Sequence, residues 1–105
     1  MDEVRCEIVR WVSDEPQPGW VEASIVDARG RRWSFFDKPP VFSDGDVRQS
    51  SDFPLPGVIR CEVVSSSHAD DGVEIVEVRL LDGVESTEGA TRFLVRAEEV
   101  SPLES

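Results

Sequence analysis

The stretch from Trp20 to Pro40 constrains the fold of this chain more than any other part of the sequence. It contains two runs in which apolar and polar residues alternate, residues 20–26 and 32–37. Such alternation is typical of strands with one solvated face. Between the runs, Gly30 can supply the positive φ that a tight turn needs. The stretch therefore predicts a β-hairpin with its tip near residues 29 and 30. Its predicted buried residues are Ile25, Trp33 and Phe35.

Four further segments alternate in the same way, and clusters of Gly, Pro, Asp and Ser separate them. They are residues 3–12, 58–65, 73–81 and 91–97. The phase of the alternation slips at Ile8-Val9 and again near residues 75 and 76, which predicts a β-bulge at each place. The residues predicted to point inward are Val4, Cys6, Ile8, Ile59, Cys61, Val63, Phe93 and Val95.

The remaining segments predict connections rather than strands. Residues 41–55 lack strand alternation, but Ser43 and Asp44 can cap one turn of helix that reaches Gln49. Residues 66–72 predict a second hairpin connection with Asp71-Gly72 as its turn. Residues 82–90 predict a long loop between glycines. The acidic tail, 98–105, offers Val100 and Leu103 as anchors to the core.

Six short strands, without a repeat or an amphipathic helix of about ten residues, predict an all-β fold. The length of 105 residues fits one domain, residues 1–105, around one hydrophobic core. Closing the sheet removes edges that invite aggregation. We therefore predict a small six-stranded antiparallel Greek-key β-barrel with at most one short helical turn. An OB-like or SH3-like variant is the alternative.

Charge limits the classes of partner. The chain carries 22 acidic and 11 basic residues, for a net charge of −11. Such a field repels phosphates, so we expect a basic protein partner and no nucleic acid. No apolar run is long enough for a membrane span or a secretory signal, and the first residues are acidic. We therefore expect a cytoplasmic protein without membrane contact.

The sequence contains no pattern that indicates catalysis, a metal or a cofactor. Ser65, His68 and Asp70 lie in or directly beside one predicted connection, whereas a catalytic triad needs a buried acid from elsewhere in the fold. The single His lacks the thiolates of a zinc site. Cys6 and Cys61 lie in alternating apolar runs, so we expect buried, reduced thiols.

Two segments and one aromatic residue are candidate binding sites. The predicted loop 82–90 is longer than a hairpin needs, and such loops often bind partners. Its alternative role is a solvated connection whose Ser and Thr bond their own backbone. Arg29, Arg31 and Arg32 form an arginine cluster beside Trp33. This cluster is either a solvated hairpin tip or a site for phosphate or an acidic peptide. Trp20 is either an interface anchor or part of the core. The candidate partner-binding residues are Glu85, Ser86, Thr87, Glu88, Trp20, Arg29, Arg31 and Arg32.

Small size, acidity and the absence of catalytic patterns predict a non-enzymatic interaction module. We expect it to bind a basic protein partner, as an inhibitor or immunity-type protein does. The alternative is a barrel that binds a small ligand or an oligonucleotide beside the arginine cluster. The oligomeric state is not set by these patterns.

Overall fold

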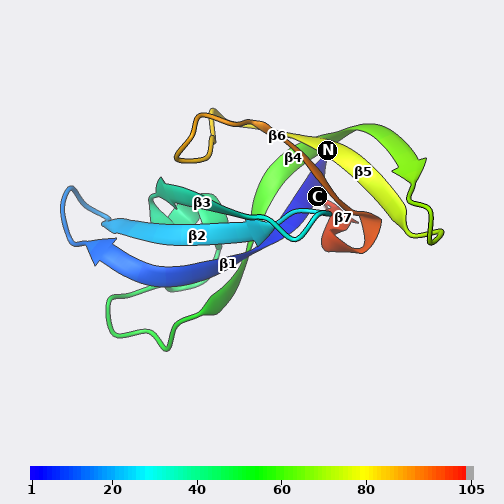
Figure 1. The fold of residues 1–105 in the computed structure, drawn as a ribbon. Coiled ribbons are helices and arrows are strands. Elements are labelled where there is room, and N and C mark those ends of the chain that lie inside the picture. The colour runs from blue at the N-terminus through cyan, green and yellow to red at the C-terminus, as the bar shows by residue number, and fades with distance from the viewer. Residues whose placement is uncertain (104–105) are drawn as a thin grey trace.

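The computed structural model describes residues 1–103, and just over half of the chain lies in one antiparallel sheet (Figure 1). Its strands are β1 (Asp2–Ser13), β2 (Trp20–Val26), β3 (Arg32–Asp37), β4 (Leu55–His68), β5 (Glu74–Leu80), β6 (Arg92–Arg96) and β7 (Val100–Pro102). One short helix, α1 (Pro39–Phe42), follows β3, and a 3-10 turn, η1 (Ala97–Glu99), precedes β7. The predicted all-β class with one helical turn is confirmed.

The order of the strands in the sheet is β3-β2-β1-β4-β5-β6, and β7 also pairs with β1. Three consecutive strands and a fourth that returns beside the first make a Greek key. The sheet curls into an open half-barrel (Figure 1). Near its two edges, Ala28 N–H donates to the Leu94 carbonyl at 2.8 Å, and Thr87 N–H donates to the Ser34 carbonyl at 2.9 Å. Two hydrogen bonds thus join the edges where a closed barrel would have a continuous ladder.

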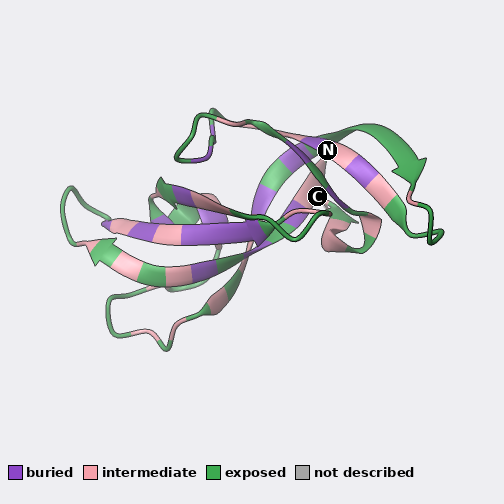
Figure 2. Ribbon diagram, viewed as in Figure 1, coloured by how far each residue is buried: buried purple, intermediate pink, exposed green. Residues whose placement is uncertain are grey.

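The core lies on the inner face of the sheet. Buried and exposed residues alternate along the strands, and the buried ones form this face (Figure 2). The hairpin prediction is confirmed for Ile25, which is 3% exposed, and Phe35, which is fully buried. Trp33 is only half-buried. At Gly57 a Cβ atom would lie 2.8 Å from the Phe42 carbonyl oxygen, so α1 packs against β4 only because this residue has no side chain.

The bulge predicted at Ile8-Val9 is confirmed, because the β1–β2 register shifts between Ile8 and Arg10. The prediction of a bulge on β5 is wrong. The shift lies on β4, where Val64 is the extra residue between the pairs formed by Val63 and Ser65. Val63 was predicted to point inward but is 41% exposed. Its pairing with β5 continues, but β1 covers β4 only as far as Cys61, so the far half of β4 has one neighbouring strand.

Two other segments differ from the prediction. Helical structure was expected after Ser43, but α1 ends at Phe42. The N–H groups in the first turn of a helix have no partner within the helix, so the missing N–H of proline costs nothing there and the two prolines can begin α1. The fully buried Phe42 fixes α1 to the core. Residues 66–68 were predicted to be a connection, yet they continue β4 and pair with residues 74–76.

The tail adds a strand that was not predicted. Val100 in β7 pairs with Val4 and packs against the core, and Leu103 N–H donates to the Met1 carbonyl at 3.1 Å. Both predicted anchors are therefore partly buried, and the ends of the described chain lie side by side (Figure 1). Residues 104 and 105 of the predicted tail lie outside the described residues. Within residues 1–103, no helix is long and apolar enough to cross a membrane.

Candidate functional site

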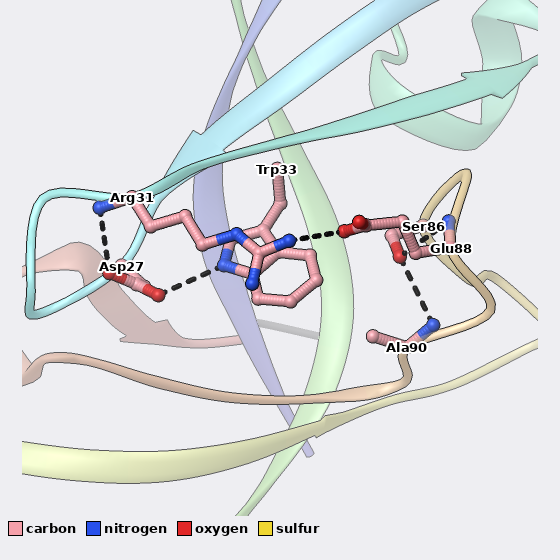
Figure 3. Close-up of polar contacts among 6 residues, drawn as sticks. All are labelled: Asp27, Arg31, Trp33, Ser86, Glu88 and Ala90. Carbon is pink, nitrogen blue, oxygen red and sulfur yellow. Dashed lines mark hydrogen bonds and ion pairs between the residues drawn. The ribbon is translucent and has the colours of Figure 1, made fainter.

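Asp27 fixes the tip of the β2–β3 hairpin. Its Oδ1 accepts the backbone N–H group of Arg29 at 2.9 Å. The same oxygen accepts the Arg31 N–H at 3.0 Å, and Oδ2 accepts the Trp33 indole N–H at 2.9 Å (Figure 3). Partial burial tends to raise the pKa of Asp27. The hydrogen bonds from Trp33, Arg31 and Arg29, with the charge of Arg31, outweigh it and hold this pKa below its usual value of 3.8. The carboxylate is therefore ionised at neutral pH.

Arg31 extends from this tip towards the loop 82–90. Its guanidinium group lies over the Trp33 ring, 3.7 Å from the ring centroid, and forms an ion pair with Glu88 at 2.5 Å (Figure 3). The Trp33 ring also contacts Phe93 edge to face, with centroids 5.0 Å apart. The geometry combines a cation–π contact with a charge-assisted hydrogen bond.

The loop 82–90 is held by its own residues. Ser86 is 4% exposed, and its hydroxyl oxygen accepts the N–H groups of Glu88 at 3.2 Å and Ala90 at 3.1 Å (Figure 3). The Ser86 backbone adds two hydrogen bonds of 2.9 Å, with Ala90 and Gly89. Ser86 thus bonds its own backbone, as one of the two sequence interpretations expected. Thr87 and Glu85 are exposed on the same loop.

The structure brings together only part of the predicted partner-binding set. Arg31 and Glu88, from two segments that the sequence analysis treated separately, contact each other. Arg32 turns away and donates to the Ser24 hydroxyl at 3.2 Å. Trp20 is half-buried at the other end of β2, opposite Ser13. Arg29 is exposed, and among residues 1–103 its side chain forms no ion pair.

A pocket of about 200 Å³ adjoins the loop 82–90. Its polar lining includes three carboxylates, from Glu3 in β1, Asp44 after α1 and Asp82 in the loop. None of the three forms an ion pair with another described residue. The lining also contains Arg60 and the apolar side chains of Phe42, Val84 and Leu103. We call this site the acidic pocket.

Sequence reasoning missed Glu3 and Asp44 as site residues. The signal that could have found them is the acidic excess, but it carries no position in space. Within residues 1–103, seven of the eleven basic side chains form ion pairs with carboxylates. Acidic residues outnumber basic ones two to one, and most carboxylates of residues 1–103 form no ion pair.

The two cysteines are free and buried, as predicted. Burial, with a smaller effect of Glu7, raises the pKa of Cys6 to about 12. Burial, with the nearby charges of Asp2 and Glu3, raises the pKa of Cys61 to about 11. Both thiols are therefore protonated and unreactive at neutral pH.

Three residues of the types found in a catalytic triad lie at the exposed end of β4 and in the turn between β4 and β5. Ser65, His68 and Asp70 are all exposed. The neighbouring Ser66 hydroxyl donates to the Glu74 carboxylate at 2.8 Å. In the described part of the chain, no three His, Cys, Asp or Glu residues are grouped so that they could hold a metal ion.

Comparisons of the chain with protein-family models, with curated proteins and with solved structures gave no match.

Proposed function

We propose that this protein is a non-enzymatic interaction module that binds a basic protein partner through the acidic pocket and the adjoining loop 82–90. The observation that carries the proposal is the set of three carboxylates, on Glu3, Asp44 and Asp82, around a partly apolar pocket. A Lys or Arg side chain of a partner can lay its methylene stem on the apolar lining and place its charge among these carboxylates.

The charge of the whole molecule supports the same kind of partner. A net charge of −11 creates a field that steers a basic surface towards the pocket and accelerates association. A small acidic protein of this type can mask a basic active surface, as an inhibitor or immunity-type protein does. No chemical step is needed for that role.

Oligonucleotide binding has less support. Arg31 covers one face of Trp33, and Glu88 pairs with the same guanidinium group. The aromatic ring is thus not free to stack a base on that face, and the charge of Arg31 is already balanced. Both features are needed where single strands bind by stacking and phosphate contact.

The choice of test residues follows from these contacts. Glu88 is a poor choice, because its substitution also breaks the ion pair with Arg31. Asp44 and Asp82 are better, since neither forms an ion pair among the described residues. Asp82 has a φ of 60°, which Asn tolerates better than most residues, so the variant is Asp44→Asn/Asp82→Asn.

The test compares this variant with Glu15→Gln/Asp70→Asn, which removes two exposed charges elsewhere. The association rate with a basic protein isolated from the native host is measured by stopped-flow fluorescence at low and high salt. We expect the pocket variant to associate about tenfold more slowly than wild type at low salt, with a smaller difference at high salt. Equal effects of both variants, or tight binding of the wild type to DNA or RNA, would contradict the proposal.

A further inference from the structure

A second pocket lies where β1 leaves one neighbouring strand for another. β1 pairs with β2 from Glu7 onwards and with β7 only as far as Val4. On this side, Arg5 and Cys6 have no partner strand within residues 1–103. Successive residues of a strand direct their peptide groups to opposite sides, so one of the two presents its N–H and C=O to the gap. A pocket of about 310 Å³ opens there, which we call the gap pocket.

The floor of the gap pocket is apolar. Val4, Ile25 and Val95 line it and are each at most 3% exposed. The Cys6 thiol adds to this floor, and because burial raises its pKa to about 12, it is uncharged at neutral pH. An apolar floor with few polar groups at its margin is the usual composition of a small-molecule site.

Arg32 and Ser24 provide polar groups of the pocket lining. Ser24 is 3% exposed, and its hydroxyl accepts a hydrogen bond from Arg32 Nη1 at 3.2 Å. In residues 1–103, Arg32 forms no ion pair, although the chain has twice as many acidic as basic residues. A guanidinium group has five N–H donors, and the neutral Ser24 hydroxyl uses one of them.

Arg5, from β1, also lines the pocket and is incompletely bonded. Its Nη1 is 3.8 Å from Glu99 Oε2, which is an ion-pair distance but too long for a hydrogen bond. The Arg5 side chain is 65% exposed. Two guanidinium groups with available donors therefore line the same pocket as the apolar floor.

We infer that the gap pocket binds a small organic anion that has one carboxylate or phosphate group and an apolar body. The anionic group bonds Arg32, with Arg5 within the same lining, while the apolar body contacts Val26, which also lines the pocket and is 49% exposed. Glu7 and Glu99 also line the pocket, so its formal charge is zero. This balance favours a single anionic group over a polyanion, and the volume is at the small end for ligand sites.

The test titrates the ¹⁵N-labelled protein with three aromatic probes and follows its amide resonances by NMR. The probes are benzoate, phenyl phosphate and benzyl alcohol, which differ in the group attached to the ring. We expect benzoate or phenyl phosphate to shift resonances of residues 4–7, 24–26 and 95, and whichever binds more tightly identifies the anionic group. Benzyl alcohol should bind at least about tenfold more weakly, since it lacks the charge-assisted bond.

Two arginine variants separate a site from general electrostatics. Arg32→Gln should weaken binding of the better probe about tenfold or more. Arg29→Gln removes the same charge from an exposed residue that does not line the pocket, and it should leave the affinity unchanged. The inference is wrong if the two variants behave alike, if benzyl alcohol binds as tightly as the anions, or if no probe binds at millimolar concentration. The two pockets share no lining residue, so such a failure would leave the acidic pocket untouched.

Discussion

Arg31 and Glu88 are separated by 57 positions in the sequence, and their side chains form an ion pair with an N···O distance of 2.5 Å. The pair joins the tip of the β2–β3 hairpin to the loop 82–90. The two side chains are 54% and 59% exposed, so solvent screens the pair. Its main effect is geometric, because it holds the arginine cluster against the loop and leaves Glu85 as the loop glutamate that forms no ion pair within residues 1–103.

The strength of this pair is the first prediction. A double-mutant cycle with Arg31→Gln and Glu88→Gln should give a coupling free energy below about 1 kcal/mol, as exposed pairs do. The free energies of unfolding are obtained by urea denaturation. A coupling of several kcal/mol would show that the pair is an important source of stability, contrary to its exposure.

Ser86 should contribute more to stability than the ion pair does. Ser86→Ala removes a buried acceptor and leaves the N–H groups of Glu88 and Ala90 without it, at a cost of about 1 to 3 kcal/mol. Ser66→Ala is the control, because Ser66 lies on the exposed part of β4 and its hydroxyl donates to the exposed Glu74 carboxylate on β5. Equal urea midpoints for the two variants would contradict the role assigned to Ser86.

The pKa of Asp27 tests the geometry of the hairpin tip. Trp33→Phe keeps an aromatic ring but removes the indole N–H, so the pKa of Asp27 should rise towards 3.8. A lowered carboxyl pKa stabilises the fold above the unfolded value, and this stabilisation is lost as the pH falls through the folded value. Carbon-13 NMR titration of the carboxyl group measures the change. An unaltered pKa in the variant would show that the indole does not bond the carboxylate in solution.

Because of the two cysteines, the free energy of unfolding should decrease at alkaline pH. The folded pKa values of Cys6, about 12, and Cys61, about 11, exceed the usual 9.0, so the unfolded chain loses these protons first. Stability should therefore fall as the pH rises above about 9, by up to about 1.4 kcal/mol per pH unit for each thiol. The Cys6→Ala/Cys61→Ala variant should show a smaller decline in urea denaturation at pH 8 and pH 10.5. An identical decline in both proteins would rule out the thiols as its cause.

Local patterns predicted the strands well, and neighbours in space account for the differences. The alternation around Ile25 and Phe35 located the hairpin, because each strand has one wet face. The apolar residues of β5 suggested a slip near residues 75 and 76, but β5 keeps one phase, with Val76 and Val78 buried and Ile75 half-buried on the other face. A bulge changes the phase only of the strand that carries the extra residue, which here is β4. The bulge at Val64 therefore required the register of the pair.

The candidate site was predictable only in part. The loop 82–90 and the arginine cluster were identified from composition, but their contact through Arg31 and Glu88 depends on how the sheet curls. The three carboxylates of the acidic pocket come from three separate segments, and nothing local distinguishes Glu3 or Asp44 from the other acidic side chains. A count of charges predicts the sign of a partner but not the place where it binds.

The most direct test of the account is to locate where a cationic probe binds. The ¹⁵N-labelled protein is titrated with a tetra-arginine peptide at low salt, and amide shifts are recorded for the wild type and for Asp44→Asn/Asp82→Asn. The account predicts that the largest shifts fall at residues around the acidic pocket, including Glu3, Asp44 and Asp82, and that the variant weakens them. Shifts that are largest at the β4–β5 turn around Asp70, or that are equal in the two proteins, would contradict it.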